Sequence, residues 1–162
     1  MSGNNNGFAL DFGQSYRKAA DYCALQDRCI SEMRLKFISW NIDRSFTNAI
    51  ISKLVDEGFI DEKRFALNYA GGKYRINGWG RLKIAAGLRS RNIPATLIQQ
   101  ALSTFENDNY ISFLNKLLQK KLKQLGGDTH ENRQKAAFFA ASRGFEPGLI
   151  ATQLHDIDLS EF

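Results

Sequence analysis

The stretch "SWNI" at Ser39–Ile42 recurs as "SRNI" at Ser90–Ile93 and as "SRGF" at Ser142–Phe145, at spacings of 51 and 52 residues. The third residue of each stretch is Asn or Gly, the residue types that most readily adopt the left-handed backbone that ends a helix. The fourth residue is apolar, which suits the hydrophobic contact made just after such an end. The recurrence predicts three successive helical modules of about 50 residues.

Helical periodicity extends outward from these stretches, and strand-like alternation is missing. The pattern predicts three helices in each module, at 14–27, 29–40, 44–57, 61–76, 79–91, 94–105, 108–125, 128–143 and 146–156. We therefore expect an all-α fold of three tandem three-helix repeats stacked into an elongated, curved solenoid. The expected parts are a flexible, dispensable tail at 1–12 and repeats at 13–60, 61–106 and 107–157.

The clearest helix is the one predicted at 108–125. Its core face carries Leu114, Leu118, Leu122 and Leu125. Its opposite face carries Lys116, Lys120 and Lys123. Gly126 and Gly127 should end this helix, and Asp128, with Glu131 three residues later, is typical of a capping box that begins the next one.

The basic charge is concentrated in the middle of the chain. Lys and Arg number 7 against 9 Asp and Glu in residues 1–62, 12 against 2 in residues 63–123, and 3 against 6 in residues 124–162. Such a distribution indicates either a solvated basic face or a site for a polyanion. The candidate contact residues for a partner or nucleic acid are Lys73, Arg75, Arg81, Lys83, Arg89, Arg91, Lys116, Lys120 and Lys123.

Enzymatic, metal and cofactor chemistry find little support. Cys23 and Cys29 fit no zinc pattern, so we expect reduced thiols, and His130 and His155 have no ligand at metal-binding spacing. The glycine-rich "GGKYRINGWGR" lies between predicted helices rather than after a strand, which argues against a phosphate loop. We therefore expect no enzyme activity, no catalytic residue, no bound metal and no cofactor.

The sequence also predicts where the protein resides. It has no apolar run of about 18 residues, and its first residues lack the charged and apolar regions of a signal peptide. We expect a cytoplasmic protein without a membrane partner, and nothing in the sequence requires more than a monomer.

The stretch "LVDEGFIDEKRFALNYAGGKYRINGWGRLKIAAGLRSRNI" at 54–93 resembles the signature of the RecX family, bacterial regulators of the RecA recombinase. "ADYCALQDRCISEMRLKF" in the first repeat is similar to the opening helix pair of that family. The resemblance implies a regulatory protein that binds RecA and the RecA–ssDNA filament. It also implies inhibition of the recombinase, ATPase and co-protease activities of RecA, and so modulation of DNA repair, recombination and the SOS response.

Two other classes of function stay open at this point. A helical module could bind duplex or single-stranded DNA directly, with the basic residues on phosphates and Tyr74 or Trp79 against sugar or base. A repeat scaffold could instead have a wholly protein partner. Salt dependence separates these classes, because binding through several phosphate contacts weakens steeply as salt rises.

Overall fold

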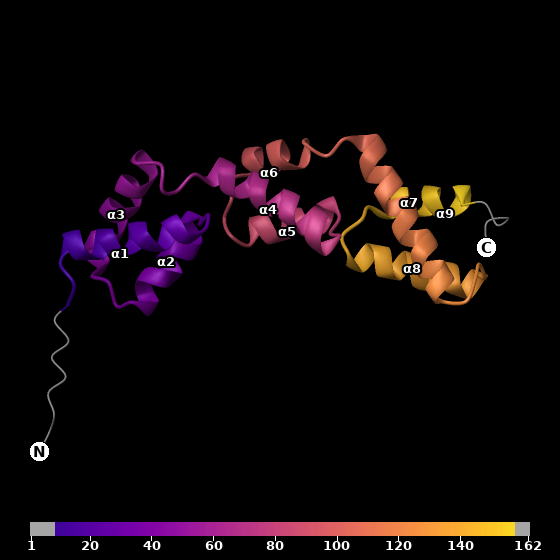
Figure 1. The fold of residues 1–162 in the computed structure, drawn as a ribbon, viewed down its shortest axis with the longest axis horizontal. Helices are drawn as coiled ribbons and strands as arrows, with labels where there is room; N and C mark the ends of the chain where they lie inside the picture. The colour runs from indigo at the N-terminus through magenta and orange to yellow at the C-terminus, as the bar shows by residue number, and fades with distance from the viewer. Residues whose placement is uncertain (1–8, 158–162) are drawn as a thin grey trace, which may run out of the picture. The chain divides into compact units, whose positions relative to one another are not determined.

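The computed structural model describes residues 9–157, and within that range every regular element is an α-helix (Figure 1). The helices are α1 Phe12–Leu25, α2 Ile30–Ser39, α3 Arg44–Asp56, α4 Glu62–Asn77, α5 Arg81–Arg89, α6 Ala95–Leu102, α7 Asn107–Gln124, α8 His130–Ser142 and α9 Pro147–Asp156. The prediction of an all-α fold built from tandem three-helix repeats is confirmed.

The three repeated stretches end helices as expected. Asn41, Asn92 and Gly144 have φ angles of 57°, 56° and 92°, so each lies in the left-handed region. The apolar residue that follows is buried in all three cases. After α2, the Ile42 amide donates to the Phe37 carbonyl at 3.0 Å, and after α8 the Phe145 amide donates to Ala140 at 3.2 Å. These bonds satisfy carbonyls that the helix itself leaves unpaired.

The described residues form two compact units. Unit 1 comprises 9–65 together with 91–93, and unit 2 comprises 66–90 together with 94–157. The boundary between the units falls within α4, and the loop after α5 belongs to unit 1. The two compact units therefore do not coincide with the three expected repeats, whose boundaries stay a prediction.

Unit 1 has an apolar core between α1, α2 and α3. Both α1 and α2 pack against α3, and Met33, Phe37 and Leu54 are among its fully or almost fully buried side chains. Cys23 and Cys29 are unbridged, which confirms the prediction of reduced thiols, and both are buried.

The prediction of a flexible tail at 1–12 is wrong for Leu10, Asp11 and Phe12, which have fixed partners. Asp11 caps α1: its carboxylate accepts from the Gln14 amide at 2.7 Å, and the Gln14 side chain accepts from the Asp11 amide at 3.0 Å. Leu10 and Phe12 pack against the core of unit 1, and the Phe12 ring meets Phe46 edge-on at 5.6 Å. A capping box with an apolar residue before it anchors this segment. Residues 1–8 lie outside the described residues.

Unit 2 has its core around α7, which packs against α8 and α9. Leu114, Leu118 and Leu122 are fully buried, as expected, whereas Leu125 is half-buried just past the end of the helix. The predicted cap at Asp128 is wrong by one residue: the Thr129 hydroxyl accepts from the Asn132 amide and begins α8. Asp128 instead forms an ion pair with Arg133, which holds the pKa of this carboxyl below its usual range.

Candidate partner-binding surface

A basic groove of about 450 Å³ lies in unit 2, between the C-terminal end of α4, α7 and α8. Among the described residues that line it, none is Asp or Glu. Its basic lining consists of Arg75, Lys120, Lys121 and Arg143. The leucine face of α7 points into the core, and this orientation leaves Lys120 exposed on the outer surface of the helix. Three helices thus gather positive charge without a carboxylate to neutralise it.

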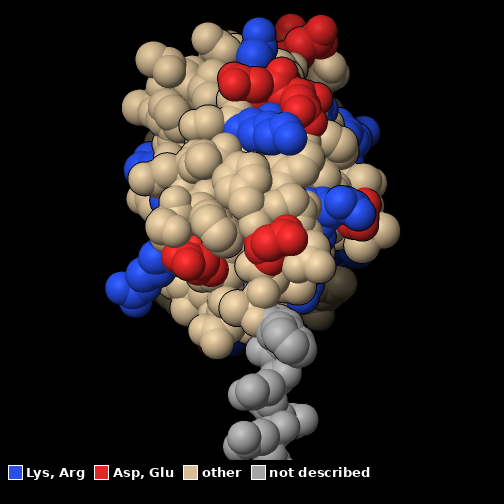
Figure 2. Space-filling view, turned by 90° about the vertical axis from the view of Figure 1, so that its left-hand side faces the viewer, with Lys and Arg blue, Asp and Glu red and all other residues tan. Residues whose placement is uncertain are grey.

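The one face of unit 1 that Figure 2 shows provides a contrast. Lys and Arg side chains are interspersed there with Asp and Glu among a larger number of uncharged residues. This mixture agrees with the slight excess of acidic residues in residues 1–62. We therefore place the candidate surface in unit 2.

The groove brings together only part of the predicted contact set. Arg75 and Lys120 line it. Lys116 and Lys123 are exposed on α7, the helix of Lys120, but do not line the groove. Arg89, in the last turn of α5, is also exposed and also lies outside the groove.

Lys73 and Lys83 lie against Trp79, which is half-buried just before α5. Their ammonium groups are 4.8 Å and 4.5 Å from the centre of the indole ring, within the range of a cation–π interaction. The Lys83 ammonium also reaches the Ser142 carbonyl at 3.5 Å. Both lysines therefore help to fix Trp79 and the segment between α4 and α5.

Arg81 is held within unit 2 by groups far away in the sequence. Its guanidinium donates to the Asn107 side chain at 2.8 Å, pairs with Glu146 at 3.5 Å and lies 4.0 Å from the centre of the Tyr110 ring. The Tyr110 hydroxyl donates to Glu146 at 2.7 Å and accepts from the Arg81 amide at 3.0 Å. Burial, followed by the bond to Glu146, raises the pKa of Tyr110. Arg81 thus has a structural role that its sequence context did not indicate.

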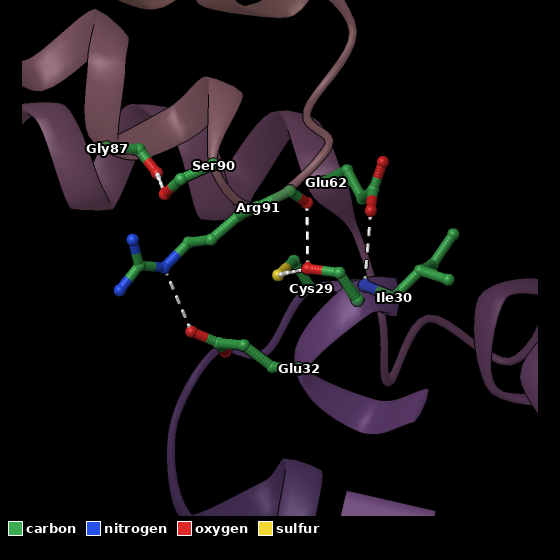
Figure 3. A network of polar contacts seen from close by, with 8 residues as sticks. Cys29, Ile30, Glu32, Glu62, Gly87, Ser90 and Arg91 are labelled. Carbon is green, nitrogen blue, oxygen red and sulfur yellow. Dashed lines mark hydrogen bonds and ion pairs between the residues drawn. The ribbon is translucent and has the colours of Figure 1, made fainter. Parts of the chain in front are cut away.

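Arg91 is likewise engaged within unit 1, at the start of α2 (Figure 3). Its guanidinium lies 3.2 Å from a carboxylate oxygen of Glu32, and its carbonyl accepts from the Ser31 hydroxyl at 2.8 Å. Next to it, the Ile30 amide donates to the Glu62 carboxylate at 3.1 Å. The N-cap side chain, Cys29, accepts from no backbone amide of the helix, so the Glu62 carboxylate supplies the acceptor for the Ile30 amide, while the Ser31 hydroxyl and the Arg91–Glu32 ion pair join the helix to the loop after α5.

The start of α5 has a corresponding arrangement in unit 2. The amides of Gly80 and Leu82 donate to the carbonyls of Arg143 and Gly144, at 2.7 Å and 2.9 Å. The end of α8 therefore caps the beginning of α5, with opposite ends of the two helix dipoles in contact.

The groove residues that the sequence prediction did not include comprise two further cations, Lys121 and Arg143, and the ring between them, Phe139. Lys121 and Arg143 lie over the Phe139 ring, 4.6 Å and 5.0 Å from its centre, and Arg143 also donates to the Asn77 carbonyl at 2.8 Å. Arg143 belongs to the repeated stretch "SRGF", and this position was a signal that could have identified it.

The described residues offer neither a metal site nor a membrane-spanning helix. They contain no group of three or more His, Cys, Asp or Glu side chains placed to hold a metal ion. No helix between residues 9 and 157 is both long enough and apolar enough to cross a membrane.

Comparisons with known proteins identify the relatives of this chain. Residues 61–102 match a family model described as the second three-helix domain of RecX, and residues 114–152 match the third. "Regulatory protein RecX" of Xanthomonas axonopodis pv. citri is 32% identical over 123 residues, which cover 74% of this chain and 72% of the relative. The chain belongs to the RecX family. The RecX protein of the same name from Chlorobium phaeobacteroides is 30% identical over 118 residues, covering 70% of this chain and 76% of the relative.

A solved structure shows the same fold. The crystal structure of RecX from Lactobacillus salivarius matches with a TM-score of 0.82, over 91% of this chain and 97% of the other, at 23% identity. The names of the relatives describe regulatory proteins, and they support a RecX-type regulatory role for this chain.

Proposed function

We propose that this protein is a non-catalytic cytoplasmic regulator that binds the RecA recombinase and the RecA–ssDNA filament. By binding it inhibits the recombinase, ATPase and co-protease activities of RecA, and so modulates DNA repair and the SOS response. Membership of the RecX family is the observation that carries the proposal.

The basic middle of the chain supplies the contact surface in this proposal. We assign the contact to the exposed members of the predicted set, Arg75, Arg89, Lys116, Lys120 and Lys123. Arg81 and Arg91 serve the fold through Glu146 and Glu32. Lys73 and Lys83 support the surface from beside Trp79.

Direct DNA binding is the weaker alternative, because its expected aromatic platform is engaged within the protein. Tyr74 is packed among aromatic rings, 4.7 Å from Phe105 and 4.9 Å from Phe113 between ring centres. Trp79 has two ammonium groups near its ring. Single-strand binding proteins of low sequence preference instead offer open rings on which bases stack.

A pull-down on RecA–ssDNA filaments tests the proposal, with DNA-only and RecA-only beads as controls. We expect the chain to be retained on filaments, and RecA-driven ATP hydrolysis to fall as the chain is added. Retention on DNA alone that disappears steeply between low and physiological salt would support the direct DNA-binding alternative instead. If the chain is retained neither on filaments nor on DNA alone, both the proposal and the DNA-binding alternative are contradicted.

A further inference from the structure

The basic groove contains apolar as well as charged surface. Ile76, at the end of α4, has 84% of its surface exposed, and it lines the groove with half-buried Leu117 of α7. When a partner covers such an exposed aliphatic side chain, apolar surface is removed from water, and this burial favours binding. The groove therefore offers an aliphatic contact beside a cluster of cations.

The cations of the groove are partly preorganised. Arg143 is fixed by its bond to the Asn77 carbonyl, and Lys121 and Arg143 both lie over Phe139. Positions fixed before binding reduce the entropy lost when an anion arrives. Lys120 is exposed beside them and completes a surface of one sign.

The aromatic rings of the groove are poorly suited to a nucleic-acid strand. Phe139 already pairs with Lys121 and Arg143, and Phe113 packs against Tyr74 and Phe145, at 4.9 Å and 6.1 Å between ring centres. The aliphatic side chains of Ile76 and Leu117 provide no ring on which a base can stack. They suit an aliphatic side chain of a polypeptide.

We propose that this groove binds an acidic polypeptide segment of the protein partner. Carboxylates of the segment meet Lys120, Lys121 and Arg75, and an aliphatic side chain of the segment covers Ile76 and Leu117. The proposal rests on the proposed function, because it names the kind of partner surface that the regulator engages.

Fluorescence anisotropy of the full chain with short labelled peptides tests this proposal. The probe is a fluorescein-labelled peptide of Glu-Glu-Leu repeats, the neutral control replaces each Glu by Gln, and a labelled oligothymidylate represents nucleic acid. We expect saturable binding of the acidic peptide, weakened by salt, and none of the neutral peptide.

Two substitutions and one matched control locate the binding. Lys120→Glu and Ile76→Ser should each weaken peptide binding about fivefold to tenfold, whereas Lys63→Glu, the same change on an exposed residue in the first turn of α4 and outside the groove, should change it less than about twofold. All three positions are exposed, so unchanged helical circular dichroism is expected for each variant.

Three results would overturn the proposal. The acidic peptide does not bind, or Lys63→Glu weakens peptide binding as much as Lys120→Glu does, or oligothymidylate binds and its binding is lost with Lys120→Glu while Ile76→Ser has no effect. Filament pull-down of the same proteins separates this failure from that of the proposed function. Retention of the parent chain on RecA filaments without peptide binding rejects only the groove assignment, whereas loss of filament retention rejects the function itself.

Discussion

The starts of α2 and α5 solve the same problem with different chemistry. In neither helix does the side chain of the N-cap residue, Cys29 in one and Gly80 in the other, accept from a backbone amide of the first turn. At α2, side chains reach across: Glu62 accepts from the Ile30 amide, and the Ser31 hydroxyl donates to the Arg91 carbonyl (Figure 3). At α5, backbone carbonyls of Arg143 and Gly144 accept from the Gly80 and Leu82 amides, and one side chain, the hydroxyl of Tyr110, accepts from the Arg81 amide between them.

The difference determines how much sequence change each place tolerates. A side chain can shift by a rotamer to accommodate a new neighbour, whereas two backbones in contact leave room only for glycine. A Cβ atom on Gly80 would lie 2.5 Å from the Gly144 carbonyl, and one on Gly144 would lie 2.3 Å from the Lys83 Cβ. The start of α5 should therefore be the more fragile of the two.

The largest effect is expected from Gly144→Ala. The residue has a φ of 92°, and its new Cβ would also come within 2.5 Å of the Lys83 amide nitrogen. We expect the free energy of unfolding to fall by about 3–4 kcal/mol in urea denaturation, from left-handed strain plus the clash. Gly126→Ala is the matched control, because its φ is 95° and nothing lies within 4 Å of its Cβ. Equal losses in the two variants would show that the close approach contributes nothing.

Gly80→Ala should have the next largest effect. Its backbone is extended, at φ −83°, so only the clash with Gly144 is at issue. We expect a loss of about 2–3 kcal/mol of unfolding free energy. Gly148→Ala in α9, where nothing lies within 4 Å of the new Cβ, should leave stability unchanged or raise it by up to about 1 kcal/mol. A Gly80 variant as stable as the Gly148 variant would remove the distinction between the two helix starts.

Glu62→Ala tests the side-chain cap of α2 and should cost less. It leaves the Ile30 amide without its acceptor, and water can replace part of that bond because the site is only partly buried. We expect a loss of about 1 kcal/mol in thermal or chemical denaturation. Lys63→Ala, on the exposed neighbouring residue, should stay within about 0.5 kcal/mol of the parent. A loss as large as that of Gly80→Ala would mean that side-chain caps are no more tolerant than backbone ones.

The smallest effect should come from the ion pair of Arg91 and Glu32. The two side chains retain 34% and 28% of their exposure, so solvent screens their attraction. A double-mutant cycle of Arg91→Ala and Glu32→Ala should give a coupling energy below about 1 kcal/mol. A coupling above about 2 kcal/mol would make this pair, rather than the hydrogen bonds beside it, the main link to α2.

The helix ends were predictable because their causes are local. Asn41 and Asn92 are residue types that indicate a left-handed backbone, and the apolar Ile42 and Phe145 indicate the buried contact that follows. The same local reasoning failed for residues 10–12, because the packing of Phe12 depends on Phe46, which the sequence does not place beside it.

The candidate site was only partly predictable, because charge is visible in a sequence and its partners are not. Arg81 and Arg91 were predicted as contact residues from their charge, and the sequence did not show that each also pairs with a carboxylate, Glu146 and Glu32, 65 and 59 positions away. Lys120 was identified correctly as an outward-facing residue because the leucines of α7 fix the orientation of that helix. The grouping of Lys120 with Arg143 requires the packing of α7 against α8, which no local pattern encodes.

The caps of the second helices also set an order in time for a chain made from its N-terminus. The first amide of α2 is bonded to the carboxylate of Glu62, and the amides at the start of α5 are bonded to the hydroxyl of Tyr110 and the carbonyls of Arg143 and Gly144. Each of these helices is therefore synthesised well before the groups that complete it leave the ribosome. The start of α8 uses the hydroxyl of Thr129, which is already made when the helix emerges. During translation, the starts of α2 and α5 therefore gain their hydrogen-bond partners only after later segments are made, whereas the start of α8 has its partner as soon as the helix emerges.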